Sequence, residues 1–417
     1  MRILMLTDDL LIDRRILQEA ESLIDVGHEV ILIARGDQDT VQYEHVGRVK
    51  VERVPDHIVL PRRPNPLACA AALAARRMVP RPLPLPAIAV RAGRRLMRPA
   101  LWAAKAALLL LRSQMRKRKS PNAWLPYESL ILDQARYYEP DVVHVHDLPR
   151  LALGVRIKEL TGAPLVYDAH ELYPEIATLT AAQKWALSRL EARLSPRCDR
   201  VITVNPFIAR EMANRYGIEE PVVLCNAIDP PADLHRNGRP DRLRQDLELP
   251  PSTRILLYQG WMSRTRGLQE LVRAMAEVDK RIHLVMMGYG EAREELVGIA
   301  DELGLRGRVH FKDAVPVEEL LWWTASADAG IIPYQPVDLN NYYCSPNKLF
   351  EFIQAHLPPI VNDLPFLRSL VGEEGFGVVA PLEKAESYVA AIGRAFDPES
   401  GGTERFRERI RERAEAY

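Results

Sequence analysis

The stretch SPNKLFEF at residues 345–352 combines a helix start with two ionisable side chains in unusual places. Ser345 is a residue type that caps helices, and Pro346 suits the first helical turn. Lys348 would lie in that turn, where the helix dipole is already positive, at a cost of about 0.3–1 kcal/mol unless an anion binds. Two interpretations remain: a solvated helix face carrying a Lys348–Glu351 ion pair, or a site where Lys348 meets an anion and Glu351 binds a ribose.

A second stretch, YQGWMSRTRGLQEL at 258–271, has the residue types of a phosphate-binding turn. Gly260 ends an expected strand, and Gly267 begins an expected helix with Arg266 directly before it. Backbone N–H groups at a helix start attract a phosphate, and a guanidinium can bind it in a bidentate manner. Exposed turn arginines are the alternative interpretation. If both stretches bind one ligand, Arg266 and Lys348 would hold a diphosphate between them.

Polar residues also follow three expected strands in the first half of the chain. They are Asp8, Asp9, Asp13, Arg14 and Arg15, then His144, His146 and Asp147, and then Asp168, His170 and Glu171. Ligands of open parallel sheets bind beyond the carboxyl ends of the strands. A single aspartate there is often a helix cap and a single histidine is often structural, but three neighbouring strands with such ends predict a polar cleft. We find no spacing typical of metal ligands and expect no metal ion.

The segments that must position these residues alternate between strand and helix. The expected strands are 2–9, 29–35, 140–147, 163–170, 199–205 and 221–227, and then 254–260, 281–288, 309–315, 328–334 and 358–363. This alternation predicts an α/β protein with two Rossmann-like doubly wound domains facing a central cleft. We predict an N-terminal domain at 1–228, a C-terminal domain at 229–395 and a final helix at 396–417.

Charge is distributed unevenly along the chain. The formal net charge of the 417 residues is zero, yet residues 57–127 contain 15 Lys and Arg and no Asp or Glu. Their apolar stretches are shorter than the roughly 18 apolar residues of a membrane-spanning helix. We expect a basic amphipathic insertion in the N-terminal domain that lies on an anionic membrane surface. A partly disordered or self-packed insertion with solvated basic residues is the alternative, and nothing favours a nucleic-acid partner.

Two further features concern the cellular compartment. The four cysteines are widely spaced and form no C-x-x-C pair, so neither a disulfide framework nor a zinc site is expected. The first residues, MRILMLTDDL, contain an apolar run too short for a signal peptide. We therefore expect a cytoplasmic protein that is peripheral on the inner face of the cell membrane.

Together these motifs resemble the GT-B fold glycosyltransferases of the large family 4 of retaining enzymes. The resemblance is carried by IDRRILQEAESLIDVGHEVILIA, PDVVHVHD, VYDAHELYPE, CDRVITVN, NAID, QGWMSRTRGLQEL and SPNKLFEFIQAHLPPIVNDLP, over about residues 1–50 and 128–395. It implies a nucleotide-sugar donor on the C-terminal domain and an acceptor on the N-terminal domain. It also implies that the final helix crosses back to the N-terminal domain.

The resemblance assigns roles to individual residues. The implied donor contacts are Gly260, Arg266, Ala314, Val315, Asn347, Lys348, Leu349 and Glu351, and the implied acceptor-side residues are Asp9, Arg15, His146 and His170. Arg266 matches the residue at the donor phosphates, and Glu351 matches the one at the ribose hydroxyls. His146 matches the active-site histidine near the transferred sugar, and these three are the implied catalytic residues. The loop Lys312–Val315 would contact the nucleobase.

Two positions depart from the family pattern. Tyr343 stands where a second glutamate that contacts the donor sugar is usual, and Trp261 replaces a basic residue after the strand-ending glycine. Asn341 or Cys344 could compensate. The sugar is therefore less defined by the sequence than the nucleotide.

The resemblance implies sugar transfer from a donor such as a UDP- or GDP-sugar, with retention at the anomeric carbon and without a cofactor or metal. Preorganised cations and N–H groups would stabilise the leaving diphosphate. The expected acceptor is a lipid-linked or cell-envelope glycan at the cytoplasmic membrane face. The alternatives are a nucleotide-sugar epimerase of the same fold, which needs no acceptor, and a membrane-bound scaffold whose degenerate site binds neither UDP nor GDP.

Overall fold

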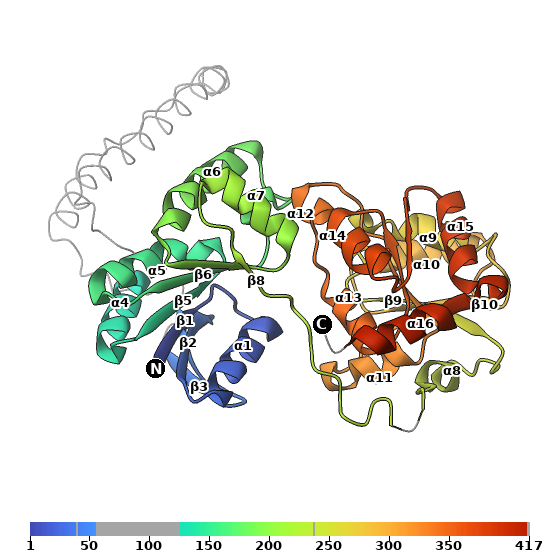
Figure 1. The fold of residues 1–417 in the computed structure, drawn as a ribbon, viewed down its shortest axis with the longest axis horizontal. Helices are drawn as coiled ribbons and strands as arrows, with labels where there is room; N and C mark the ends of the chain where they lie inside the picture. Colours follow the sequence, from blue (N-terminus) through green and yellow to red (C-terminus); the bar gives the residue numbers. More distant parts are fainter. Residues whose placement is uncertain (39–40, 56–125, 237, 415–417) are drawn as a thin grey trace, which may run out of the picture.

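The computed structural model describes residues 1–38, 41–55, 126–236 and 238–414, which form two α/β domains lying side by side (Figure 1). The predicted basic insertion at 57–127 falls almost entirely outside these residues. None of the helices in the described ranges is long and apolar enough to cross a membrane.

The N-terminal domain is built on an eight-stranded sheet with the order β3-β4-β2-β1-β5-β6-β7-β8. Its strands are β1 (Arg2–Leu6), β2 (Glu29–Gly36), β3 (Gln42–Val46), β4 (Val49–Pro55), β5 (Val142–His146), β6 (Leu165–Ala169), β7 (Arg200–Thr203) and β8 (Val222–Val223). Neighbouring strands are parallel except for the antiparallel pair β3 and β4 at one edge. The central strands β1 and β5 are almost wholly buried, as expected for parallel strands covered on both faces.

Helices cover this sheet and begin near its carboxyl edge. They are α1 (Arg14–Asp25), α4 (Pro126–Tyr138), α5 (Leu148–Thr161), α6 (Ala181–Leu194) and α7 (Pro206–Tyr216), with the 3-10 helices η1 (Tyr173–Glu175) and η2 (Ser195–Arg197). Asp13 caps α1 by accepting a hydrogen bond from the backbone N–H of Arg15. Because α1 starts there, Arg14 and Arg15 lie at the edge of the sheet that faces the second domain.

The C-terminal domain contains a six-stranded, all-parallel sheet with the order β11-β10-β9-β12-β13-β14. Its strands are β9 (Arg254–Gln259), β10 (Ile282–Met287), β11 (Val309–Lys312), β12 (Ala329–Ile332), β13 (Pro359–Asn362) and β14 (Val378–Ala380). Its helical segments are α8 (Arg242–Asp246), η3 (Arg264–Arg266), α9 (Leu268–Ala274), α10 (Arg293–Glu302), η4 (Val317–Glu319), α11 (Leu320–Ala325), α12 (Leu339–Tyr342), α13 (Asn347–Gln354), α14 (Pro365–Leu367), η5 (Arg368–Glu373), α15 (Ala385–Phe396), η6 (Pro398–Ser400) and α16 (Gly402–Arg413).

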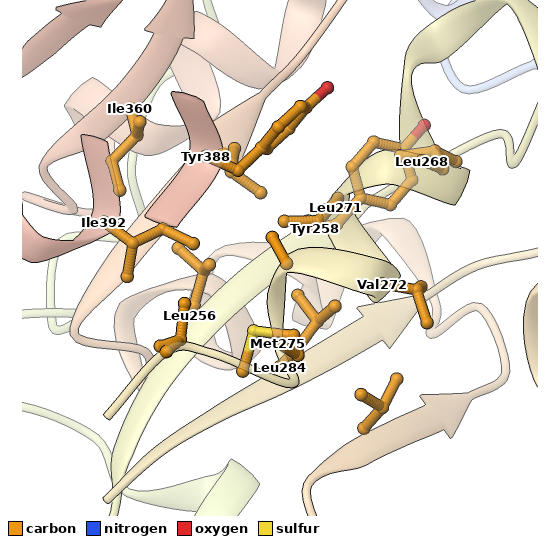
Figure 2. Packing of buried hydrophobic residues seen from close by; sticks show 14 of the residues in the cluster. Leu256, Tyr258, Leu268, Leu271, Val272, Met275, Leu284, Ile360, Tyr388 and Ile392 are labelled. Atoms are coloured by element: carbon orange, nitrogen blue, oxygen red, sulfur yellow. The ribbon is translucent and has the colours of Figure 1, made fainter. Parts of the chain in front are cut away.

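Helix α9 illustrates how this domain is held together. Its side chains Leu268, Leu271 and Val272 share one fully buried cluster with Leu256 of β9 and Leu284 of β10 (Figure 2). Burying each such side chain stabilises the fold by about 1.5–3 kcal/mol. The packing also fixes the turn between β9 and α9, which carries η3, at the carboxyl edge of the sheet.

The structure confirms the two predicted doubly wound domains, and a strand is present in each predicted range that the structure describes, although the strand predicted at 221–227 is reduced to the two residues of β8. The segment predicted at 396–417 is placed differently from the expectation. Ile410 of α16 lies in a hydrophobic cluster of the C-terminal domain, and Arg407 donates hydrogen bonds to the carbonyls of Asp328 and His356. Helix α16 therefore packs on the domain that precedes it, instead of on the N-terminal domain.

Candidate functional site

A cavity of about 770 Å³ lies between the two domains. Arg15, His170 and Glu171 line it from the N-terminal domain, and Gly260 and Gly288 belong to its opposite wall. These residues follow strands β1, β6, β9 and β10, so the cavity lies at the carboxyl ends of both sheets. The predicted polar cleft is present in the described part of the chain.

Hydrogen bonds between the domains border this cavity. The side chain of Asn340 in α12 accepts from the backbone N–H of Leu172 at 2.8 Å and donates to the Glu171 carboxyl at 3.1 Å. The carbonyl of Tyr343 accepts from the side chain of Asn205 at 2.8 Å. The segment that leads into α13 is therefore anchored on the N-terminal domain.

Two glycines belong to the cavity wall that the C-terminal domain contributes. Gly260 follows β9 with a φ of +104°, and Gly288 follows β10 with a φ of +141°. A Cβ on Gly288 would overlap the carbonyl oxygen of Gly260, and a Cβ on Gly260 would lie 3.3 Å from Nζ of Lys348. Only glycine fits this arrangement, which lets the strand ends approach each other and Lys348.

Lys348, in the first turn of α13, is buried, and its Nζ atom has no hydrogen-bond partner. This Nζ atom lies 4.0 Å from the ring centre of Tyr258 and 5.3 Å from that of Tyr334. The guanidinium of Arg266 lies 4.0 Å from the same Tyr334 ring. Burial, together with the charge of Arg266, holds the pKa of Lys348 well below its usual value. Two neighbouring basic side chains on one cavity wall favour an anionic ligand, which would also favour the charged form of Lys348.

The start of α13 is open toward this wall. Pro346 occupies the N-cap position and makes no side-chain capping hydrogen bond. The prediction that Ser345 caps the helix is wrong, because its hydroxyl contacts the carbonyl of Val204 across the domain interface at 3.5 Å. No capping side chain covers the first backbone N–H groups of α13, which leaves them able to bind an anion.

Glu351 is buried one turn further along α13, so the interpretation as a solvated face with Lys348 is also wrong. Its Oε2 accepts a hydrogen bond from Gln259 at 2.6 Å, and Oε1 of Gln259 accepts from the hydroxyl of Thr324 at 2.8 Å. Oε1 of Glu351 lies 3.4 Å from Nη2 of Arg14 across the cleft. This carboxylate is held firmly on the cavity wall, where it can accept hydrogen bonds from hydroxyl groups.

The remaining donor-side residues fall into two groups. Ala314, Val315 and Asn347 line the cavity, as expected for residues near a bound nucleotide. Leu349 differs, because its side chain is fully buried in the core of the C-terminal domain. Only its backbone is available for a contact.

On the N-terminal side, two carboxylates hold His170. Its Nδ1 lies 3.3 Å from Asp147, and its Nε2 lies 3.2 Å from Asp168. Burial lowers the pKa of His170, but the contacts with both carboxylates outweigh burial and raise the pKa to about 10. Burial likewise favours a raised pKa for Asp168, but hydrogen bonds from His146 and His170 hold it well below the usual range. A cationic imidazole of fixed orientation therefore faces the cavity.

Two acceptor-side residues do not line the cavity. The predicted catalytic residue His146 is buried behind His170, with 3.2 Å between its Nδ1 and Nε2 of His170. Its side chain lies on the same face of β5 as that of His144, under helix α1. Asp9 accepts a hydrogen bond from the backbone of Asp13 in the turn before α1. His170, rather than His146, presents its ring to the cavity, so the role expected of His146 disagrees with its placement.

One group of side chains in the described residues could hold a metal ion. It consists of Glu19, His144, His146 and Asp168. The group lies behind His170 and outside the cavity wall. Sequence spacing did not predict it, because α1, β5 and β6 bring its members together from distant parts of the chain.

Tyr343 and Trp261, the two departures from the family pattern, have different surroundings in the structure. The ring of Tyr343 stacks on Phe207 of the N-terminal domain, with ring centres 6.2 Å apart. Asn341 and Cys344 do line the cavity. Trp261 also lines it and is 46% exposed, so an aromatic surface stands where the family has a basic residue.

Sequence reasoning missed three residues of the site. Arg14 belongs to the predicted polar run but has no predicted role, and Asn340 has no local signal, because both act across the domain interface. Gln259 orients Glu351 and directly precedes Gly260 at the end of β9. Its polar side chain at a strand end is a signal that could have identified it.

Comparisons with known proteins fit this geometry. The family model Glycosyltransferase Family 4 matches residues 86–231, and Glycosyl transferases group 1 matches residues 240–417. An uncharacterized glycosyltransferase of Methanocaldococcus jannaschii is 24% identical over 263 residues, which is 61% of this chain and 65% of that protein. D-inositol 3-phosphate glycosyltransferase 2 of Catenulispora acidiphila is 27% identical over 238 residues, 52% of this chain and 55% of that protein. The matches span about half to two thirds of the length of these curated relatives.

Solved structures show the same fold. Sucrose-phosphate synthase of Thermosynechococcus elongatus superposes with a TM-score of 0.66 at 19% identity, over 100% of this chain and 94% of that chain. HepE of Anabaena, solved in complex with UDP and glucose, superposes with a TM-score of 0.64 at 14% identity, over 99% and 94%. The chain belongs to the GT-B glycosyltransferases of the family 4 type, a class of transferase enzymes. The resemblance predicted from the sequence motifs is thereby confirmed.

Proposed function

We propose that the protein transfers a sugar from a nucleotide-diphosphate donor, with retention at the anomeric carbon, to a lipid-linked or cell-envelope glycan. One observation carries the proposal: Lys348 is a buried amine whose Nζ has no partner, and it lies beside Arg266 and the open start of α13. A pyrophosphate bound there would accept charge-assisted hydrogen bonds from both cations. Without such an anion, the burial of Lys348 is a cost with no compensation.

The proposed transfer replaces one bond at the anomeric carbon of the donor sugar with another. The bond between the anomeric carbon and the diphosphate breaks while a bond to the acceptor oxygen forms on the same face. The acceptor proton passes to the departing phosphate. Lys348, Arg266 and the N–H groups of α13 stabilise the negative charge that grows on the diphosphate.

Other residues of the cavity would bind the ribose and the base of the donor, and the acceptor. Glu351 would bind the ribose hydroxyls, and Ala314 and Val315 would border the base. The acceptor would enter from the side of Arg15 and His170. The complex of HepE with UDP supports UDP as the first nucleotide to test.

A donor screen tests the reaction itself. The full chain is incubated with a panel of UDP- and GDP-sugars, and released nucleotide is measured with and without lipid-linked glycan acceptors. Release that depends on an acceptor supports transfer, and NMR of the product reports the anomeric configuration. Conversion of the donor sugar without any acceptor would instead identify an epimerase.

Calorimetry tests the binding site independently of the acceptor. Arg266→Ala should weaken binding of UDP or GDP by about 10- to 100-fold, because a hydrogen bond to a charged group is worth about 1.5–3 kcal/mol. Arg264→Ala is the matched control from the same turn, since Arg264 is exposed and pairs with Glu295 at 2.8 Å. We expect the control to bind the nucleotide as the unmodified chain does. Absence of binding of both nucleotides to the unmodified chain would favour the scaffold alternative.

A further inference from the structure

A cluster of four side chains lies behind His170, in the N-terminal domain. The cluster, called here the His–carboxylate cluster, consists of Glu19, His144, His146 and Asp168. Each residue offers one ligand atom, and these atoms all lie within 4.8 Å of one another. The residues come from α1, β5 and β6, so rigid elements of the fold bring them together.

The polar atoms of this cluster are poorly satisfied. Oε2 of Glu19, Nε2 of His144 and Nε2 of His146 are buried and have no hydrogen-bond partner. His144 is 7% exposed and His146 is 1% exposed, so both imidazole rings are almost entirely buried. A buried polar group without a partner costs about 1–3 kcal/mol. Three such atoms in one small buried cluster favour a ligand that can satisfy them.

The charges of the cluster indicate the sign of that ligand. Glu19 and Asp168 bring two carboxyl groups into a small buried volume, and Nε2 of His144 lies 3.8 Å from Glu19 and 3.9 Å from Asp168. Two buried carboxylates repel each other unless a proton or a cation lies between them. Nε2 of His144 faces both carboxyl groups and can pair with them only through a proton or a cation.

The set of donor atoms indicates the chemical class of the cation. Two imidazole nitrogens and two carboxylate oxygens suit a divalent transition ion such as Zn²⁺, whereas Mg²⁺ and Ca²⁺ prefer oxygen ligands alone. In a tetrahedral Zn²⁺ site, neighbouring ligand atoms lie about 3.4 Å apart. Small side-chain rotations would bring the present ligand atoms to that separation.

A route from solvent to the cluster is also present. A second cavity, of about 450 Å³, is lined by Glu19 and His144 together with apolar side chains of β1, β5, β6 and β7. This cavity is distinct from the one between the domains. An ion can therefore reach the cluster without passing through the proposed donor site.

We propose that the His–carboxylate cluster binds one divalent transition-metal ion of the Zn²⁺ class. The ion has a positioning role, since Nε2 of His170 contacts both Asp168 and His146 at 3.2 Å and its ring faces the cavity. An ion held by these two residues would fix the ring from behind, as outer-shell partners do in metal sites. The proposal revises the expectation of no metal ion and is independent of the proposed transfer reaction.

The test measures metal directly. The full chain without a histidine tag is purified, and its metal content is determined by mass spectrometry before and after chelation. We expect one Zn²⁺ per chain, and a return to one per chain when Zn²⁺ is added to the stripped protein. Co²⁺ added instead should give the intense visible absorption of a tetrahedral nitrogen–oxygen site.

Variants locate the ion. Glu19→Gln and His144→Gln should weaken Zn²⁺ binding by at least about tenfold, the lower end of the effect seen even for outer-shell changes. His283→Gln is the matched control, because His283 also pairs with another histidine, His310, at 3.0 Å but lies in the other domain. The control should bind Zn²⁺ as the unmodified chain does.

Two results would overturn the proposal. One is a folded chain that carries no metal and binds neither Zn²⁺ nor Co²⁺, in which case Glu19 and Asp168 share a proton. The other is equal Zn²⁺ binding by the unmodified chain and the cluster variants. If a variant does not fold, the Co²⁺ spectrum of the unmodified chain decides, since a weak octahedral spectrum contradicts the four-ligand site.

Discussion

Lys348 shows how one residue can lower stability in exchange for binding. Its Nζ is buried without a partner, and the cost of burying this unpaired polar group lowers the stability of the folded protein. Lys348→Met keeps the bulk of the side chain and removes the charge. We expect the variant to be more stable by about 1–4 kcal/mol and to bind UDP or GDP about 10- to 100-fold more weakly. Chemical denaturation and calorimetry measure the two effects.

The lowered pKa of Lys348 makes nucleotide binding depend on protons. Burial disfavours the charged amine in the free protein, whereas a bound diphosphate would favour it and raise the pKa again. Nucleotide binding should therefore take up a proton at pH values between the lowered pKa of the free protein and the higher pKa of the complex, and affinity should fall as pH rises through this range. Calorimetry in buffers of different ionisation enthalpy counts this proton. Lys280→Met, at an exposed site, should leave the count unchanged, whereas an unchanged count in Lys348→Met would contradict the argument.

Residues of the site differ in how far the sequence could predict them. Lys348 was predictable because a lysine in the first turn of a helix is unfavourable without an anion. The eight residues 345–352 are enough to show this conflict. Arg14 was not predictable, because its contact with Glu351 depends on how the two domains face each other. His146 was predicted as catalytic by resemblance, but its burial behind His170 depends on the packing of α1 over β5.

At the scale of elements, a glycine at the end of β10 and a glycine inside α10 should respond in opposite ways to substitution by alanine. Gly288→Ala should destabilise the protein by at least about 1–3 kcal/mol, because its φ of +141° disfavours any side chain and a Cβ would overlap Gly260. The cavity wall would shift as well, so nucleotide binding should weaken. Gly298→Ala, inside α10, meets no atom within 4 Å and should stabilise the protein by about 0.5–1 kcal/mol. Urea denaturation of both variants checks the contrast, and equal effects would contradict it.

The strands were the most predictable elements. A parallel sheet buries both faces, so β1, β2 and β10 stand out as mainly apolar runs. The hairpin β3–β4 and the edge strand β14 were not predicted. The burial pattern of β3 shows why, since all of its residues are exposed or half-buried and no apolar alternation marks it.

At the scale of the whole molecule, one interdomain contact should respond to pH. Burial, together with the charges of Asp147 and Asp338, raises the pKa of Glu171 from 4.5 to about 7. In this range the folded state binds the proton and the unfolded state does not, so the stability of the protein falls as pH rises from 4.5 to 7. Glu171→Gln keeps the interaction with Asn340 through a neutral amide and should flatten this part of the stability profile. Thermal unfolding across the range measures it, and an unchanged slope would assign the pH dependence to other groups.

The separation of charge along the chain leads to a prediction for the molecule at a membrane. Residues 57–127 hold 15 Lys and Arg and no acidic residue, while the rest of the chain has 41 basic and 56 acidic residues. The full chain should therefore bind vesicles containing anionic lipid, more strongly as the anionic fraction rises and more weakly as salt increases, because each basic residue near the surface contributes about 1 kcal/mol. Vesicle sedimentation measures this.

A paired set of variants assigns the membrane binding to the segment. Replacing the four consecutive basic residues at 116–119 with glutamine should reduce binding to anionic vesicles, whereas replacing the exposed residues Lys280 and Arg281 in the C-terminal domain should not. The comparison separates attraction by a local basic surface from attraction by net charge, which is zero for the chain. Equal binding to neutral vesicles in high salt would remove the electrostatic basis of the prediction.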